Sequence, residues 1–135
     1  MNTNTEEQSG LRRSRCPVAN TLDVIGDKWT LLIIRDMRHG KRTYGELAQS
    51  PEGIPTNILA DRLRRLEETG IIVRCAYQDR PVRYTYTLTE KGQDLGELLQ
   101  ALVRWGKKHI PGSRTLSEAA ARPGRSARIR SPRPA

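Results

Sequence analysis

The sequence contains no phenylalanine, only two cysteines and two histidines, and few aromatic residues of any kind (4%). The cysteines Cys16 and Cys75 are too few for a disulfide framework, and with His39 and His109 they show no metal-ligand spacing. We therefore expect no structural metal and no cofactor. With few large rings, the core has to be built mainly from leucine, isoleucine and valine, and such a thin core would benefit from a partner subunit.

Longer sequence features are also missing. No apolar run approaches the roughly 18 residues that a membrane span needs, and the first ten residues, MNTNTEEQSG, lack the apolar stretch of a secretory signal. These absences predict a cytoplasmic protein with no membrane partner. No glycine-rich phosphate loop is present, and the cysteines and histidines show no pairing typical of a nucleophile and its base. We therefore expect that the protein is not an enzyme.

Acidic residues are outnumbered, because 24 lysines and arginines face 15 aspartates and glutamates, a formal net charge of +9. The excess is uneven: residues 1–15 carry +1, residues 16–110 carry +3 and residues 111–135 carry +5. A basic balance favours a polyanionic partner such as nucleic acid. More than half of the excess positive charge lies in residues 111–135, so the net charge alone does not identify the function. Local sequence patterns are needed for that.

Composition divides the chain into three parts. Residues 1–15 are polar and then basic without periodicity, which predicts a flexible arm. Residues 111–135 are rich in Pro, Gly, Ser, Ala and Arg, which cannot bury enough apolar surface to offset their ordering entropy, so we expect a disordered basic tail. Residues 16–110 are predicted to form one folded domain.

Glycine, proline and capping residues divide this domain into elements. Asp27 is suited to cap a helix that begins at residue 28. Thr43 and Glu46 have the spacing of a capping box for a helix that begins at residue 44, and Thr89 is suited to cap a helix that begins at residue 90. The predicted helices span residues 17–25, 28–39, 44–49, 56–69 and 90–110, and the predicted strands span residues 71–77 and 82–88. The expected fold is mainly α with a small β-hairpin, in the order of a winged helix-turn-helix.

The fourth predicted helix has two distinct faces. Leu59, Leu63 and Leu66 form an apolar stripe directed toward the core. The opposite face carries polar side chains that can reach base edges: Asn57 can pair with adenine, Arg64 with guanine, and Asp61 can accept a hydrogen bond from cytosine.

Other side chains are suited to the DNA backbone. Thr56, Arg62 and Arg65 are predicted to contact phosphates, as are Thr43 and Tyr44 at the start of the third helix. Arg80 and Arg83 at the hairpin tip are suited to a narrow minor groove, where the potential is most negative. A winged helix that binds protein or RNA is the alternative, and the basic charge on the fourth helix and the hairpin argues against it.

Three ordered motifs carry a family resemblance. The stretches CPVANTLDVIGDKWTLLIIRDM, GIPTNILADRLRRLEETGII and RPVRYTYTLTEKG, followed by RWG, closely resemble the HxlR family of bacterial winged-helix regulators, relatives of the MarR type. The resemblance covers about residues 16–110. It implies a homodimer joined mainly by the first and last helices, which binds an inverted repeat in promoter DNA. Independently of the resemblance, repression is the commoner expectation for so compact a protein, because we expect no separate domain to contact polymerase. The residue before the recognition helix is often Ser in the family and is Pro55 here, so we expect the N-cap to pass to Thr56.

Cys16 is the candidate redox sensor. It precedes Pro17 at a predicted helix N-terminus and lies near Arg12, Arg13 and Arg15 in the sequence, so the helix dipole and the positive charges favour the reactive thiolate. Its position matches a cysteine with which some members of this family sense oxidants or electrophiles, which suggests a small oxidant or electrophile as an effector. The alternative is a small, half-buried residue at the dimer interface.

Overall fold

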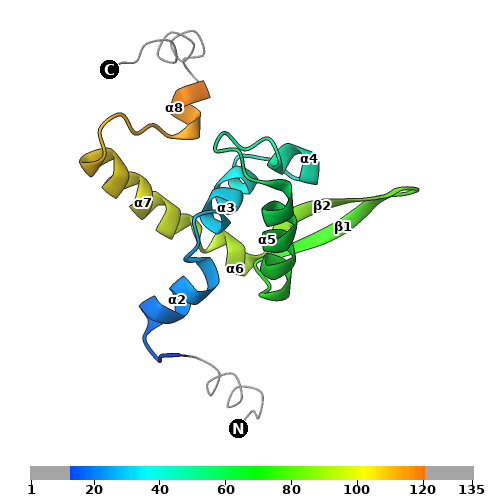
Figure 1. The fold of residues 1–135 in the computed structure, drawn as a ribbon, viewed down its shortest axis with the longest axis horizontal. Coiled ribbons are helices and arrows are strands. Elements are labelled where there is room, and N and C mark those ends of the chain that lie inside the picture. The colour runs from blue at the N-terminus through cyan, green and yellow to red at the C-terminus, as the bar shows by residue number, and fades with distance from the viewer. Residues whose placement is uncertain (1–12, 121–135) are drawn as a thin grey trace. The chain divides into compact units, whose positions relative to one another are not determined.

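A computed structural model describes residues 13–120, which form two compact units. The first unit ends at Leu95 and the second begins at Gly96. The first contains α2 (Pro17–Ile25), α3 (Thr30–Arg38), α4 (Tyr44–Leu47), α5 (Thr56–Glu68), β1 (Ile72–Asp79), β2 (Val82–Leu88) and α6 (Glu90–Gln93) (Figure 1). The second contains α7 (Gly96–His109) and α8 (Leu116–Ala120). The prediction of a mainly helical fold with a small hairpin is confirmed.

Aliphatic side chains from α3, α4, α5 and the start of β1 form the core of the first unit. Ile34 and Leu59 are completely buried, and Leu47 and Ile72 are 1% exposed. The predicted inward stripe of α5 is correct, since Leu59, Leu63 and Leu66 are all buried. Each such side chain contributes about 1.5–3 kcal/mol when it leaves water, so this stripe anchors α5 and turns its other face outward.

The two strands form an antiparallel hairpin, the wing, which projects away from α3 and α5 (Figure 1). Its register runs from the pair Ile72 and Leu88 to the pair Asp79 and Val82, with an irregularity between Ala76 and Gln78. The side-chain amide of Gln78 donates to the carbonyl oxygens of Arg80 (3.3 Å) and Pro81 (3.1 Å). These two hydrogen bonds hold the tip of the wing.

The last predicted helix is wrong in one respect, because residues 90–110 form two helices instead of one. Thr89 caps only α6: its hydroxyl accepts from the Gly92 amide (3.2 Å) and donates to the Gly70 carbonyl (2.6 Å). Gly92 itself lies so close to β1 that a Cβ atom there would be 2.3 Å from the Ile71 carbonyl oxygen. The contacts of Thr89 with Gly70 and of Gly92 with Ile71 join residues about 20 positions apart, so a local pattern cannot reveal them.

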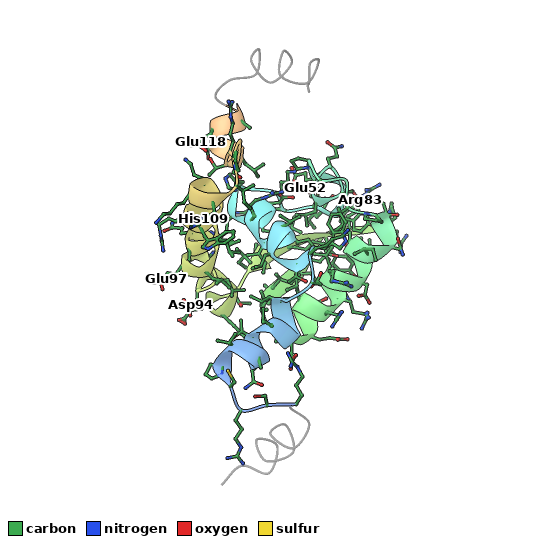
Figure 2. The ribbon with its side chains drawn as sticks, turned by 60° about the vertical axis from the view of Figure 1, so that its left-hand side comes forward. Glu52, Arg83, Asp94, Glu97, His109 and Glu118 are labelled. Atoms are coloured by element: carbon green, nitrogen blue, oxygen red, sulfur yellow. The ribbon has the colours of Figure 1, made fainter. Side chains whose placement is uncertain are left out.

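The predicted disordered tail is wrong for its first part, because it contains α8. Thr115 and Glu118 form a capping box, in which the Glu118 amide donates to the Thr115 hydroxyl (3.2 Å) and the Thr115 amide to the Glu118 carboxylate (2.8 Å). Lys107 of α7 pairs with the same carboxylate at 2.6 Å, and Figure 2 shows Glu118 on α8. The rest of the predicted tail and most of the predicted arm lie outside the described residues.

Candidate nucleic-acid interface

The start of α5 differs from the expectation. The N-cap is Pro55, which has extended backbone angles (φ −63°, ψ 143°) and no side-chain cap, and its carbonyl accepts from the Leu59 amide at 2.9 Å. The prediction that Thr56 is the N-cap is therefore wrong, since Thr56 is already the first helical residue. The backbone restriction that proline imposes is enough to start the helix without a capping hydroxyl.

The third helix, α4, is held against α5 by two of the predicted DNA-binding residues. Thr43 and Glu46 form the predicted capping box, and the Tyr44 hydroxyl donates to the Thr56 carbonyl oxygen at 2.9 Å. Hydrogen bonds from the Arg42 and Thr43 amides lower the pKa of Glu46. Thr43 and Tyr44 thus orient the helix-turn-helix, and Tyr44 remains 37% exposed.

The loop before α5 is fixed by an ion-pair cluster that the sequence reasoning missed. Arg35 donates to both carboxylate oxygens of Glu52, at 2.8 and 2.7 Å, and also to the buried Asp36. The hydrogen bonds from Arg35, with a further one from Ser50, outweigh partial burial and lower the pKa of Glu52 to about 2. Because Arg35 and Glu52 are 17 residues apart, no local spacing indicated this pair.

Arg62 occupies a different environment from the other predicted phosphate contacts. Its guanidinium donates to Asp27 at 2.9 Å and to Asp61 at 2.6 Å, and its side chain is only 17% exposed. Asp27 also accepts hydrogen bonds from the Trp29 and Thr30 amides and from the Thr30 hydroxyl. The prediction that Asp27 caps a helix beginning at residue 28 is wrong, since α3 begins at Thr30 and its N-cap is Trp29. Arg62 therefore joins α5 to the start of α3. Its phosphate contact stays a prediction, which this placement disfavours.

The remaining predicted residues of α5 lie on its outer face. Thr56 and Asn57 are exposed, and the Arg64 and Arg65 side chains are 60% and 53% exposed. Arg64 pairs with Asp61 (2.6 Å) and Glu68 (3.1 Å). Hydrogen bonds from Arg64, and then from Arg62, lower the pKa of Asp61. The structure thus brings the predicted base-contacting side chains together on one face.

The wing adds two exposed arginines to this surface. Arg80 lies at the tip, and Arg83, labelled in Figure 2, lies on β2. Arg74 on β1 was not predicted: its guanidinium lies 4.3 Å from the centre of the Tyr84 ring and pairs with Glu67 of α5 at 3.1 Å. Arg74 therefore ties the wing to α5. The alternation of side chains along the strand was the only sequence feature that could have placed it on that face.

Cys16 is exposed and occupies the N-cap position of α2. Its carbonyl accepts from the Asn20 amide (2.9 Å), and its own amide donates to the Ser14 hydroxyl (3.0 Å). The nearby Arg13 pairs with Asp23 at 2.7 Å. Cys75 on β1 is also free and exposed.

Within residues 13–120, no group of three or more His, Cys, Asp or Glu side chains is placed to hold a metal ion. Over the same described range, no helix has the length and apolar character needed to cross a membrane.

Two helices, α4 and α5, joined by the loop of residues 48–55, with the second helix followed at once by a hairpin, define a winged helix-turn-helix protein. Residues 24–114 match the model of the HxlR-like helix-turn-helix family, and the chain belongs to this family, as the resemblance predicted.

Known proteins agree with this assignment. The chain is 42% identical over 94 residues to Rv3095 of Mycobacterium tuberculosis, described as an uncharacterized HTH-type transcriptional regulator; the match covers 70% of this chain and only 59% of that protein. The reduced form of the redox regulator HypR is 34% identical and superposes with a TM-score of 0.65, over 71% of this chain and 95% of that one. The reduced transcriptional regulator YodB from Bacillus subtilis is 29% identical with a TM-score of 0.60, over 75% and 100% of the two chains.

Proposed function

We propose that this protein is a sequence-specific regulator of transcription that binds duplex DNA as a homodimer at an inverted repeat and acts as a repressor. The observation that carries the proposal is the outer face of α5, where Asn57 and Arg64 lie exposed beside a wing tipped by Arg80. A protein that acts on bacterial promoters works in the cytoplasm.

The contacts divide into two kinds. Asn57, Asp61 and Arg64 lie on the outer face of α5 and are assigned to base edges in the major groove. The residues assigned to the DNA backbone or to the neighbouring minor groove are Thr43, Tyr44, Thr56, Arg62, Arg65, Arg80 and Arg83. For Arg62 this assignment requires that it leave Asp27.

The DNA-binding proposal is tested with an operator selected from a random duplex pool by the purified protein at near-physiological salt. Reversal of charge in Arg64→Glu or Arg80→Glu should weaken binding about tenfold to a hundredfold. Arg114→Glu, an exposed arginine of the second unit, is the matched control and should leave binding unchanged. If Arg64→Glu and Arg80→Glu bind as the parent does, this surface does not read DNA.

The homodimer is supported by apolar side chains that each unit leaves exposed. In α2, Val18 and Leu22 are 67% and 52% exposed, and in α7 Leu102 and Trp105 are 48% and 60% exposed. Apolar stripes of this kind are typical of subunit interfaces. Sedimentation should give a dimer for the parent and a shift toward monomer for Val18→Asp or Trp105→Asp. A parent that stays monomeric at micromolar concentration would refute this part.

Redox control through Cys16 is the finer part of the proposal. An exposed thiol at a helix N-cap supports it, as does the similarity to a structure described as a redox regulator. Diamide should change the DNA affinity of the parent and of Cys75→Ser, but not that of Cys16→Ser. A Cys16→Ser variant that responds to diamide like the parent would leave Cys16 as a packing residue.

A further inference from the structure

We propose that Asp61 is a specificity-determining residue of α5. In the free protein it forms ion pairs with the arginines of this helix, and on DNA it weakens binding to duplexes that place no base amino group opposite it in the major groove. This inference rests on the proposed DNA-binding function and goes beyond a single contact with cytosine. Its basis is the placement of one carboxylate among all three basic side chains of α5.

The arrangement is compact. Asp61 lies 2.6 Å from Arg62, 2.6 Å from Arg64 and 3.8 Å from Arg65, and these are all the basic residues of α5. The helix also carries Glu67 and Glu68, so its three positive charges are matched by three negative ones. In the free protein, the helix that is assigned to read DNA is therefore neutral overall, and its guanidiniums are already paired.

Binding to DNA requires these arginines to exchange partners. The pairs of Arg64 and Arg65 with Asp61 are exposed, and exposed ion pairs are weak enough to be replaced by a phosphate or a base edge. The exchange leaves the Asp61 carboxylate facing the duplex. Phosphates repel it, and so do the ring nitrogens and carbonyl oxygens that act as acceptors in the major groove.

Only two groups in the major groove can satisfy this carboxylate. The amino groups of cytosine and adenine donate hydrogen bonds there, so a duplex that places one opposite Asp61 compensates for the lost arginine contacts. A duplex with the wrong base pair leaves the carboxylate near phosphates with Arg62 as its partner and with nothing to replace the lost contacts of Arg64 and Arg65. Specificity then comes from rejection of wrong sequences as much as from attraction to the right one.

The other carboxylates of α5 are not equivalent to Asp61. Glu68 contacts only Arg64 among the arginines of the helix, and Glu67 pairs with Arg74 of the wing. The inference therefore predicts that neutralising Asp61 has a much larger effect than neutralising Glu68.

The experiment compares the parent with Asp61→Asn, which keeps the shape and helix propensity of the residue. Binding is measured on a random-sequence duplex and on the operator selected with the parent, each over a salt titration. For Asp61→Asn we expect about tenfold tighter binding to the random duplex, a steeper salt dependence by about 0.9 in log-log slope for each new phosphate contact, and a lower ratio of operator to random affinity. Selection with the variant should yield operators that are less restricted at the base pair opposite residue 61.

Two controls separate the possible outcomes. Glu68→Gln tests the neighbouring carboxylate, and Glu97→Gln makes the same change of net charge at an exposed position of α7. If Asp61→Asn and Glu97→Gln bind the random duplex with equal affinity, or if the operator preference of Asp61→Asn is unchanged, the inference is overturned while the DNA-binding proposal stands. If the parent itself shows no affinity for duplex at low salt, the proposed function fails first and the inference falls with it.

Discussion

The contact between Asp27 and Arg62 gives the most quantitative prediction. Partial burial raises the pKa of Asp27, but hydrogen bonds from Thr30, from Arg62 and from the Trp29 amide together outweigh it, and the pKa falls from 3.8 to about 2. At about 1.4 kcal/mol per pKa unit, this corresponds to at most about 2.5 kcal/mol of stability. Since the Asp27 side chain is 28% exposed, screening by water reduces the expected contribution to about 1–2 kcal/mol.

The substitution Asp27→Asn isolates this charge. Asparagine keeps one oxygen that can accept from the Trp29 and Thr30 amides, so these contacts are retained, whereas the charge interaction with Arg62 and one acceptor oxygen are lost. We expect the free energy of unfolding to fall by about 1–2 kcal/mol and the Tm by about 5–10 °C for a domain of this size. Urea denaturation at fixed protein concentration measures the change. In a double-mutant cycle with Arg62→Gln, the two substitutions should be non-additive by about 1 kcal/mol.

The pH dependence provides an independent check. The folded-state pKa of Asp27 is lowered, so its contribution is fully present above the unfolded value of 3.8 and is lost as the pH falls toward about 2. The stability difference between the parent and Asp27→Asn should therefore be constant near neutrality and shrink below about pH 4. A difference that is negligible at neutral pH, or that does not change on acidification, would refute the reasoning.

Three further predictions concern the scaffold. Gly92→Ala should destabilise the folded protein by about 1–3 kcal/mol in thermal unfolding, because the added Cβ would overlap the Ile71 carbonyl oxygen. Gly45→Ala is the control: it has open space around it and should be neutral or slightly stabilising. Equal melting temperatures for the two variants would contradict this. Thr43→Ala removes the capping-box hydroxyl of α4 and should cost about 1 kcal/mol in urea unfolding, and no loss would show that the cap is dispensable. Glu52→Gln should weaken the hold of Arg35 on the loop before α5 and speed amide exchange there; unchanged exchange would rule out that role.

Local chemistry explains why much of the fold could be predicted. The stripe of Leu59, Leu63 and Leu66 follows from helical periodicity, and the capping box of Thr43 and Glu46 joins residues three apart. The same spacing in Thr115 and Glu118 was present in the tail but was outweighed there by composition, and α8 was missed.

The sequence by itself determined the order of elements, the inward and outward faces of α5 and the arginine-tipped wing, because each depends on residues within a turn or a hairpin of one another. Tertiary structure alone decided that Arg62 turns to Asp27, that Glu52 is held by Arg35, and that Gly92 lies against Ile71. These contacts join residues 17 to 35 positions apart, and at such distances the partner of a side chain is selected by packing rather than by spacing.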